Sequence, residues 1–322
     1  MKLASFAAAG RARIGLIWNG RLYDLAIAAG LCGERLGFAD MSELITGADE
    51  ARMALARIAA AIEDDAQRFE SYSDREVVFH PPVQNPSKIL CLALNNSANA
   101  DRILSGPKGP AAFTKPASAL VGHRGTIKCR PEYGRVHPEP ELALVIGKTA
   151  HEVDAAKAMD YVFGYTIHND ITSPTMRTED TFHYRAIHPR RDGGEGVEYV
   201  ESWVSYPGRY KGSDTFACMG PCIVTADEIA DPHALAVTCS HDGRLITADN
   251  TANLFHKAVD VIAYFSRYMT FEPGDIISLG TALRAGVGGG AVQNVDLNRL
   301  GGEVSVEIEG IGILSNEVEH LP

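Results

Sequence analysis

Two glutamates stand two positions apart at the start of an apolar segment. Glu139 and Glu141 open the run Glu-Pro-Glu-Leu-Ala-Leu-Val-Ile-Gly-Lys, which the pattern predicts as a β-strand. Strand side chains alternate between faces, so both carboxylates would point to one side, about 6.5–7 Å apart along the backbone. Hard divalent cations prefer carboxylate oxygens, and Asp170, which ends the segment 161–170, is a candidate third ligand. The residues alone leave a second interpretation open, namely a solvated strand face without a metal.

The segments that must position these carboxylates are predominantly strands. Runs of β-branched, aromatic and other apolar residues predict strands over 88–94, 141–148, 161–170, 274–281 and 303–318. Helical spacing of apolar residues is confined to 48–69, 152–160 and 250–268. Because few helices separate the strands, we expect an α+β fold, mostly β, rather than repeated βαβ units. Pro140 has no N–H for a ladder bond, which predicts an edge or a bulge where its strand begins.

The first eighty residues differ from the rest. Short strands over 13–18 and 20–26 are joined at Asn19-Gly20, a hairpin signal because both positions tolerate positive φ. The proline-bearing segment 74–85 breaks any helix and is expected to be a linker. We therefore expect a small N-terminal domain over residues 1–80 and a catalytic domain over residues 81–322.

The composition excludes several classes of protein. The 322 residues are 45% hydrophobic and carry a formal net charge of −11. That charge argues against nucleic acid or an anionic membrane as the partner, because both bind clustered positive charge. No apolar run approaches the roughly 20 residues of a membrane-spanning helix. The six cysteines lack Cys-x-x-Cys spacing, which favours reduced thiols and a cytoplasmic location.

Six stretches, taken in order, make the sequence similar to a known family. Any one of them is weak evidence, but the ordered set is specific. The chain resembles the fumarylacetoacetate hydrolase family over residues 88–318, and its N-terminal stretch resembles the small domain that many members carry. The stretches are FTKPASALVGH (113–123), EPELALVIGK (139–148), GYTIHND (164–170), KGSDTFACMGPCIVTADEI (211–229), FEPGDIISLGT (271–281) and VEIEGIGILSNEV (306–318).

The resemblance implies a fold and a metal site. The expected fold is a mixed β-roll that holds one Mg²⁺ or Mn²⁺ through a Glu-x-Glu pair and an aspartate. Carried to this sequence, the metal ligands are Glu139, Glu141 and Asp170. Family substrates are small 2-oxo or 1,3-dioxo carboxylic acids, and the metal stabilises the enolate that forms when a neighbouring bond breaks. A homodimer is also implied.

The same resemblance assigns three further residues. Lys211 matches the family's active-site lysine, whose ammonium would neutralise the enolate or the substrate carboxylate. Thr281 matches the threonine that hydrogen-bonds the substrate carboxylate. We also expect Asn169, beside the aspartate ligand, to contact the substrate. Without the family, Lys211 would be an ordinary exposed lysine and Thr281 a hydroxyl facing water.

One stretch departs from the family pattern. The segment 94–102 aligns with Leu-Asn-Tyr-x-x-His-Ala-x-Glu, whose His and Glu form a dyad that activates water. Here Asn99 stands at the His position and Arg102 at the Glu position. An amide cannot accept a proton near neutral pH, so Asn99 could orient a water but not deprotonate it.

A long polar segment over residues 179–210 is a second departure. Loops of such length in compact domains are often lids. One hypothesis is that the segment closes over the metal, with His183 or His188 as the missing base and Arg185 as a carboxylate clamp. The alternatives are a solvated loop or a subunit contact. His137, just before the glutamate pair, is expected to be a structural residue in a proline-flanked turn.

Three functions follow from these residues. The first is a metal-dependent hydrolase that cleaves a C–C bond next to a ketone in a dioxo- or 2-oxo-carboxylic acid. The second, favoured by Asn99, is a 2-oxo-acid lyase: a dehydratase, hydratase or decarboxylase, for example on a 2-oxo-3-deoxy sugar acid. The third is a protein that binds the metal and an oxo acid without catalysis.

Overall fold

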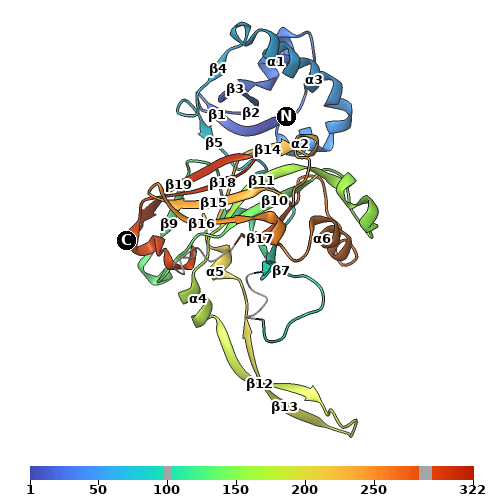
Figure 1. Cartoon of the computed structure of the whole chain (residues 1–322), viewed down its shortest axis with the longest axis vertical. Helices are drawn as coiled ribbons and strands as arrows, with labels where there is room; N and C mark the ends of the chain where they lie inside the picture. Colours follow the sequence, from blue (N-terminus) through green and yellow to red (C-terminus); the bar gives the residue numbers. More distant parts are fainter. Residues whose placement is uncertain (98–102, 283–291) are drawn as a thin grey trace.

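The computed structural model describes residues 1–97, 103–282 and 292–322 of the chain, and strands dominate it (Figure 1). The strands of the larger sheet are β1 (Lys2–Ala8), β2 (Arg11–Trp18), β3 (Arg21–Asp24), β4 (Ser71–Tyr72), β5 (Val78–Phe79), β6 (Ile89–Ala93), β7 (Ala111–Lys115), β8 (Leu120–Val121), β10 (Pro140–Ile146), β11 (Val162–Asp170), β14 (Ala217–Thr225) and β17 (Ile276–Thr281). Their order is β4-β3-β2-β1-β14-β11-β10-β17-β6-β7, with β5 beside β1 and β8 beside β14.

A second sheet packs against the larger one. Its strands are β9 (Thr126–Cys129), β15 (Ala236–His241), β16 (Arg244–Asn250), β18 (Glu303–Ile308) and β19 (Gly312–His320), in the order β16-β15-β18-β19-β9. Ile167 of β11, Val237 of β15 and Leu314 of β19 are buried in one apolar cluster between the sheets. Both sheets mix antiparallel neighbours with parallel ones such as β6–β17 and β9–β19. The predicted α+β fold, mostly β and mixed in strand direction, is confirmed.

Helices and 3₁₀ turns connect many of these strands. They are α1 (Leu25–Leu31), α2 (Met41–Thr46), α3 (Ala48–Asp64), α4 (Pro174–Glu179), α5 (Arg209–Gly212), α6 (Ala258–Phe265) and α7 (Leu297–Leu300), with 3₁₀ turns at η1 (Ala66–Arg68), η3 (Ala117–Ala119), η4 (Pro131–Tyr133), η5 (Ala155–Tyr161), η6 (Ala226–Glu228), η7 (Thr251–Asn253) and η8 (Val292–Asn294). Within the described ranges, no helix is both long and apolar enough to cross a membrane.

The N-terminal residues fold at one end of the molecule, where α1, α2 and α3 lie over β1, β2 and β3 (Figure 1). Ile58 and Ile62 of α3 share a buried cluster with Leu3 of β1 and Ile223 of β14. Because β1 pairs with β14 at Leu3↔Ile223, the larger sheet runs from the N-terminal residues into the catalytic residues. The division after residue 80 stays a prediction.

Most local predictions hold, with shorter helices than expected. Asn19 and Gly20 have φ values of 46° and 73° and join β2 to β3, as the hairpin signal predicts. The helix expected over 48–69 ends at Asp64, and the one expected over 250–268 is only α6. The second helix is shortened because Asn250 caps a 3₁₀ turn and the chain then extends before α6. The helix expected over 152–160 is the 3₁₀ segment η5.

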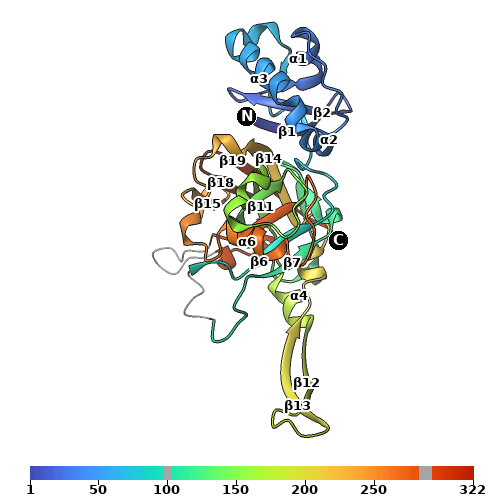
Figure 2. The ribbon, with the colours of Figure 1, turned by 90° about the vertical axis from the view of Figure 1, so that its right-hand side faces the viewer.

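The segment predicted as a polar loop forms a hairpin instead. β12 (Thr181–Pro189) pairs with β13 (Val197–Ser205) in a two-stranded sheet of its own, between α4 and α5. Both views show this hairpin extending away from the body (Figures 1 and 2). The strands form because aromatic and β-branched residues recur among the polar ones, a pattern that favours β structure over an irregular loop.

Candidate metal centre

Two neighbouring strands bring the predicted metal ligands together. Glu139 and Glu141 flank Pro140 at the start of β10, and Asp170 ends the antiparallel neighbour β11. Two hydrogen bonds join the start of β10 to the end of β11. The Asp170 N–H donates to the Glu139 carbonyl at 2.9 Å, and the Glu139 N–H donates to Asn169 Oδ1 at 2.9 Å. The register of β10 against β17 shifts between Glu141 and Ala143, which is the bulge that Pro140 predicts. As a result, one carboxylate oxygen from each of the three residues lies within 4.8 Å of the others.

Two buried lysines stand among these carboxylates. Lys211 of α5 places Nζ 2.6 Å from Asp170 Oδ2 and 2.7 Å from Glu139 Oε2. Lys115 of β7 forms an ion pair with the other oxygen of Asp170. Glu141 and Asp170 are each only 1% exposed, so the carboxylates would repel strongly without nearby cations.

The lysines lower the pKa of the Glu139 and Asp170 carboxyls. Burial raises the pKa of Glu139, but Lys211 and His137 more than offset this and hold that pKa well below its usual range. Burial likewise raises the pKa of Asp170, and Lys115 and Lys211 bring it below the ordinary value. Burial lowers the pKa of Lys211, yet attraction to Asp170 and Glu139 dominates and raises it. Glu139, Asp170 and Lys211 are therefore charged at neutral pH.

Side-chain hydroxyls of β17 orient the Glu141 carboxylate by hydrogen bonds. Ser278 Oγ donates to Glu141 Oε2, and Thr281 Oγ1 donates to Glu141 Oε1 at 3.1 Å. His168 Nδ1 lies 2.8 Å from the Ser278 hydroxyl, which makes a fully buried chain from His168 through Ser278 to Glu141. Such partners of ligand residues fix ligand orientation and tune metal affinity.

The donor set fits a divalent cation. All three candidate ligands offer oxygen, which suits Mg²⁺, Mn²⁺ or Ca²⁺ and not the softer ions that prefer thiolate. Lys115 pairs with Asp170, and Lys211 pairs with Asp170 and Glu139. The three carboxylates outnumber these two ammonium groups, so a divalent cation is electrostatically favourable there. Glu139 is the least buried of the three, with its side chain 15% exposed, and gives the cluster contact with solvent.

Comparison with known proteins identifies the family of this chain. A family model described as the C-terminal domain of fumarylacetoacetate (FAA) hydrolase matches residues 88–319. The chain belongs to the fumarylacetoacetate hydrolase family. Human mitochondrial oxaloacetate tautomerase FAHD2A is 35% identical over 244 residues, which cover 76% of this chain and 70% of that protein.

Solved structures of the fumarylacetoacetate hydrolase family share the whole fold. Fumarylacetoacetate hydrolase from Exiguobacterium antarcticum matches with a TM-score of 0.74 at 26% identity, over 100% of both chains. Maleylpyruvate hydrolase from Sphingobium, in complex with manganese(II) and pyruvate, matches with a TM-score of 0.71 at 26% identity, again over 100% of both. The predicted family, the predicted fold and the expectation of an enzyme are confirmed.

Two of the three residues predicted to bind substrate, Thr281 and Asn169, contact the candidate metal ligands. Thr281 ends β17 and donates to Glu141, and at 3.3 Å to Glu139 Oε2. Asn169 is 1% exposed and accepts the backbone N–H of Glu139. His137 lies with Nε2 3.1 Å from Glu139 Oε1, so the proline-flanked turn also contacts a candidate ligand. These contacts orient the carboxylates.

Of the residues predicted at or in place of the family's base, the two histidines lie in the projecting hairpin. Asn99 falls outside the residues that the structure describes. His183, Arg185 and His188 lie on β12, in the projecting hairpin. His183 bonds Glu201 and stacks on Trp203 with 3.9 Å between ring centroids, so its recorded contacts are within the hairpin. The hypothesis that this segment supplies a base to the metal centre stays a prediction.

Sequence reasoning missed three residues of the centre: Lys115, Ser278 and His168. Ser278 and His168 are polar residues in the almost wholly buried strands β17 and β11, and that pattern is a signal that could have found them. Lys115 ends the half-exposed strand β7 and carries no such signal. His168 also stands two positions before Asp170 in β11, and so on the same face of the strand.

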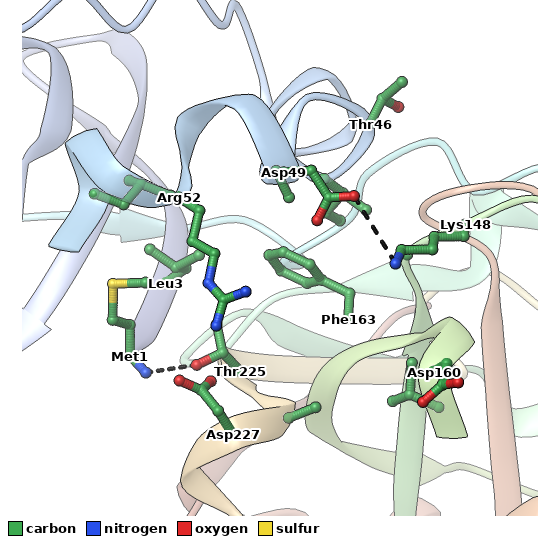
Figure 3. Close-up of a pocket in the computed structure, with 16 residues that line it drawn as sticks. Met1, Leu3, Thr46, Asp49, Arg52, Lys148, Asp160, Phe163, Thr225 and Asp227 are labelled. Atoms are coloured by element: carbon green, nitrogen blue, oxygen red, sulfur yellow. Dashed lines mark hydrogen bonds and ion pairs between the residues drawn. The ribbon is translucent and has the colours of Figure 1, made fainter. Parts of the chain in front are cut away.

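A separate cavity of about 310 Å³ lies between the N-terminal and catalytic residues (Figure 3). Leu3 and Phe163 line it, and Lys148 Nζ lies 3.8 Å from Asp49 Oδ2 at its rim. The three clustered carboxylates are not among its described lining residues. Its lining contains both acidic and basic side chains, and we assign no reaction to this cavity.

Ser278→Ala is expected to weaken divalent-metal binding by about 10–100-fold, because it removes the hydrogen bond that orients Glu141. Isothermal titration calorimetry with Mn²⁺ measures the change. Ser87→Ala, at an exposed serine, is the matched control and leaves the affinity as it is. An affinity within about twofold of wild type in Ser278→Ala contradicts the orienting role.

Proposed function

We propose that this chain is a divalent-metal-dependent enzyme that converts a small oxo-carboxylic acid through its enolate. The observation that carries the proposal is the cluster of Glu139, Glu141 and Asp170 with Lys211 Nζ against it. A divalent cation held by these carboxylates would act as a Lewis acid on a ketone oxygen. One relative is named an oxaloacetate tautomerase, and one similar structure is a maleylpyruvate hydrolase. Both names refer to oxo-acid substrates, which supports this substrate class.

Lys211 acts as a fixed positive charge in this proposal. Its raised pKa means that the ammonium keeps its proton at neutral pH, so Lys211 is a hydrogen-bond donor and not a base. Its side chain is 9% exposed, whereas that of Lys115 is fully buried. Of the two lysines, Lys211 is therefore the one placed to meet the negative charge of an enolate, while Lys115 balances Asp170.

Keto–enol tautomerisation of a 2-oxo diacid is the first candidate reaction. It requires a proton to leave the enol oxygen and another to reach the adjacent carbon, with no water added across a bond. The 35% identity to an oxaloacetate tautomerase favours it. The sequence favours it too, because Asn99 replaces the histidine that would activate water for hydrolysis.

Hydrolysis of a C–C bond in a dioxo acid is the second candidate. Full-length similarity to a maleylpyruvate hydrolase supports it. Purified enzyme offered enol-oxaloacetate, acylpyruvates and 2-oxo-3-deoxy acids separates the candidates. Faster ketonisation without new products indicates a tautomerase, two carboxylic acid fragments indicate a hydrolase, and loss of water or CO₂ indicates the lyase. Binding without any turnover would support the non-catalytic protein and contradict the proposal.

Removal of the metal is expected to abolish turnover reversibly. Dialysis against EDTA should lower the rate to background, and Mg²⁺ or Mn²⁺ should each restore it, because the oxygen donors accept both. Calorimetry of the metal-free protein gives the order of affinity between the two ions. Full activity after EDTA, with metal loss verified by elemental analysis, contradicts the proposal.

We further propose a cytoplasmic homodimer, to be tested by localisation and by solution mass.

A further inference from the structure

The ring of His168 is completely buried, and one of its two nitrogens has no hydrogen-bond partner in the described part of the chain. His168 lies in β11, two positions before Asp170, and is 0% exposed. Its Nδ1 lies 2.8 Å from the Ser278 hydroxyl, whereas Nε2 is the unpartnered nitrogen. Burying an unpartnered polar nitrogen costs free energy that an apolar side chain would not incur. Packing alone therefore does not explain a histidine here, and its bond to Ser278 is the feature that does.

The donors and acceptors around Ser278 fix the direction of that bond. Ser278 has one hydroxyl proton, which Oγ donates to Glu141 Oε2. The Ser278 oxygen can then only accept from His168, so Nδ1 carries the proton in their bond. An unprotonated Nδ1 would be an acceptor and would compete with Glu141 for the hydroxyl proton. The ring thus directs this proton to the carboxylate.

The two oxygens of Glu141 have different surroundings. Oε2 accepts from Ser278 and lies 3.8 Å from Nδ1 of His168, within the buried chain of polar groups. Oε1 accepts from Thr281 Oγ1 at 3.1 Å, and the same hydroxyl lies 3.3 Å from Glu139 Oε2. Oε1 is therefore the oxygen that shares a neighbour with the next candidate ligand. Oε2 is committed to a protein donor.

The other two candidate ligands are held in a similar way. Asp170 Oδ1 pairs with Lys115, whose side chain is 0% exposed, and Glu139 Oε1 lies 3.1 Å from Nε2 of the buried His137. The remaining oxygens, Asp170 Oδ2 and Glu139 Oε2, both face Lys211. Each of the three carboxylates thus has one oxygen occupied by a buried protein group. This arrangement favours an ion that takes a single oxygen from each residue.

Divalent cations differ in that requirement. Mg²⁺ demands a compact octahedral shell, whereas Ca²⁺ accepts a larger and looser shell in which a carboxylate often supplies both oxygens. We infer that His168 is a positioning residue that acts through Ser278, keeps Oε2 of Glu141 from the ion, and thereby disfavours Ca²⁺ relative to Mg²⁺. The inference rests on the metal centre of the proposed function and assigns ion selectivity to a residue outside the candidate ligand set.

Calorimetric titration of the metal-free full chain with Mg²⁺ and with Ca²⁺ tests this role. The wild type is expected to bind Mg²⁺ more tightly than Ca²⁺. His168→Leu removes the donor to Ser278 and is expected to lower the ratio of Mg²⁺ to Ca²⁺ affinity by at least about 10-fold. His168→Asn keeps an N–H donor close to the Nδ1 position and should retain the ratio within about threefold. His151→Leu makes the same change at an exposed histidine and is the control.

A measurement on the wild type covers the case in which His168→Leu does not fold. Long-range ¹H–¹⁵N correlation spectra of the ¹⁵N-histidine-labelled chain are expected to show a proton on Nδ1 of His168. A structural role alone would lower the thermal midpoint of His168→Leu and weaken both ions in parallel.

Three results would overturn the role of His168: an Nδ1 without a proton, a wild type that binds Ca²⁺ as tightly as Mg²⁺, or a folded His168→Leu chain with an unchanged affinity ratio. These results leave the metal centre itself in place, since both ions still bind. A wild-type chain that binds neither ion contradicts the metal centre, and with it the proposed function.

Discussion

Glu141→Gln is expected to lower kcat/KM by at least about 10³-fold, equivalent to about 4 kcal/mol of transition-state stabilisation. The substitution removes one of three clustered carboxylate charges and keeps the side chain's size. Because Glu141 is 1% exposed and held by Ser278 and Thr281, no mobile side chain can take its place. Affinity for Mn²⁺, measured by calorimetry on the same protein, should fall by at least about 100-fold.

Two further variants make this result interpretable. Glu132→Gln makes the same change at an exposed glutamate and should retain wild-type activity and metal affinity. Glu141→Asp keeps the charge but shortens the reach, so its loss should be smaller than that of Glu141→Gln. Circular dichroism and the thermal midpoint show whether each variant is folded. A folded Glu141→Gln enzyme with unchanged turnover is incompatible with a metal centre at these carboxylates.

Lys211→Met is expected to separate catalysis from metal binding. The ammonium of Lys211 contacts Asp170 and Glu139, so it competes with a cation for the same oxygens. Its removal should leave metal affinity unchanged or strengthen it several-fold. Turnover should nevertheless fall by about 10²–10³-fold, because one fixed donor to the developing enolate is lost.

The test is that turnover falls while metal affinity does not. Single-turnover rates on metal-loaded Lys211→Met and calorimetry on the metal-free variant provide the two readings, and Lys157→Met is the control at an exposed lysine. The fold should persist because Lys115 still balances Asp170. If the variant loses metal affinity as steeply as Glu141→Gln does, Lys211 is a structural part of the metal site and not a donor to substrate.

Local pattern predicted the parts of the molecule that depend on near neighbours in sequence. The hairpin at Asn19-Gly20 follows from backbone preferences of two adjacent residues. The core of α3 follows from apolar spacing along one segment. The segment 179–210 was predicted as a loop because charged residues interrupt its two-residue alternation. The pairing of β12 with β13 shows that the segment is a hairpin.

The sequence by itself was enough to predict which carboxylates come together. Strand alternation puts Glu139 and Glu141 on one side, and the resemblance to the family adds Asp170. Only the tertiary structure brought in Lys115 and Ser278, whose partners lie 55 and 137 positions away in sequence. Those contacts depend on the order β14-β11-β10-β17-β6-β7, and strand order is decided by how whole sheets bury their faces. No local periodicity encodes it, so the balancing charges and orienting hydrogen bonds emerge only when the sheet is assembled.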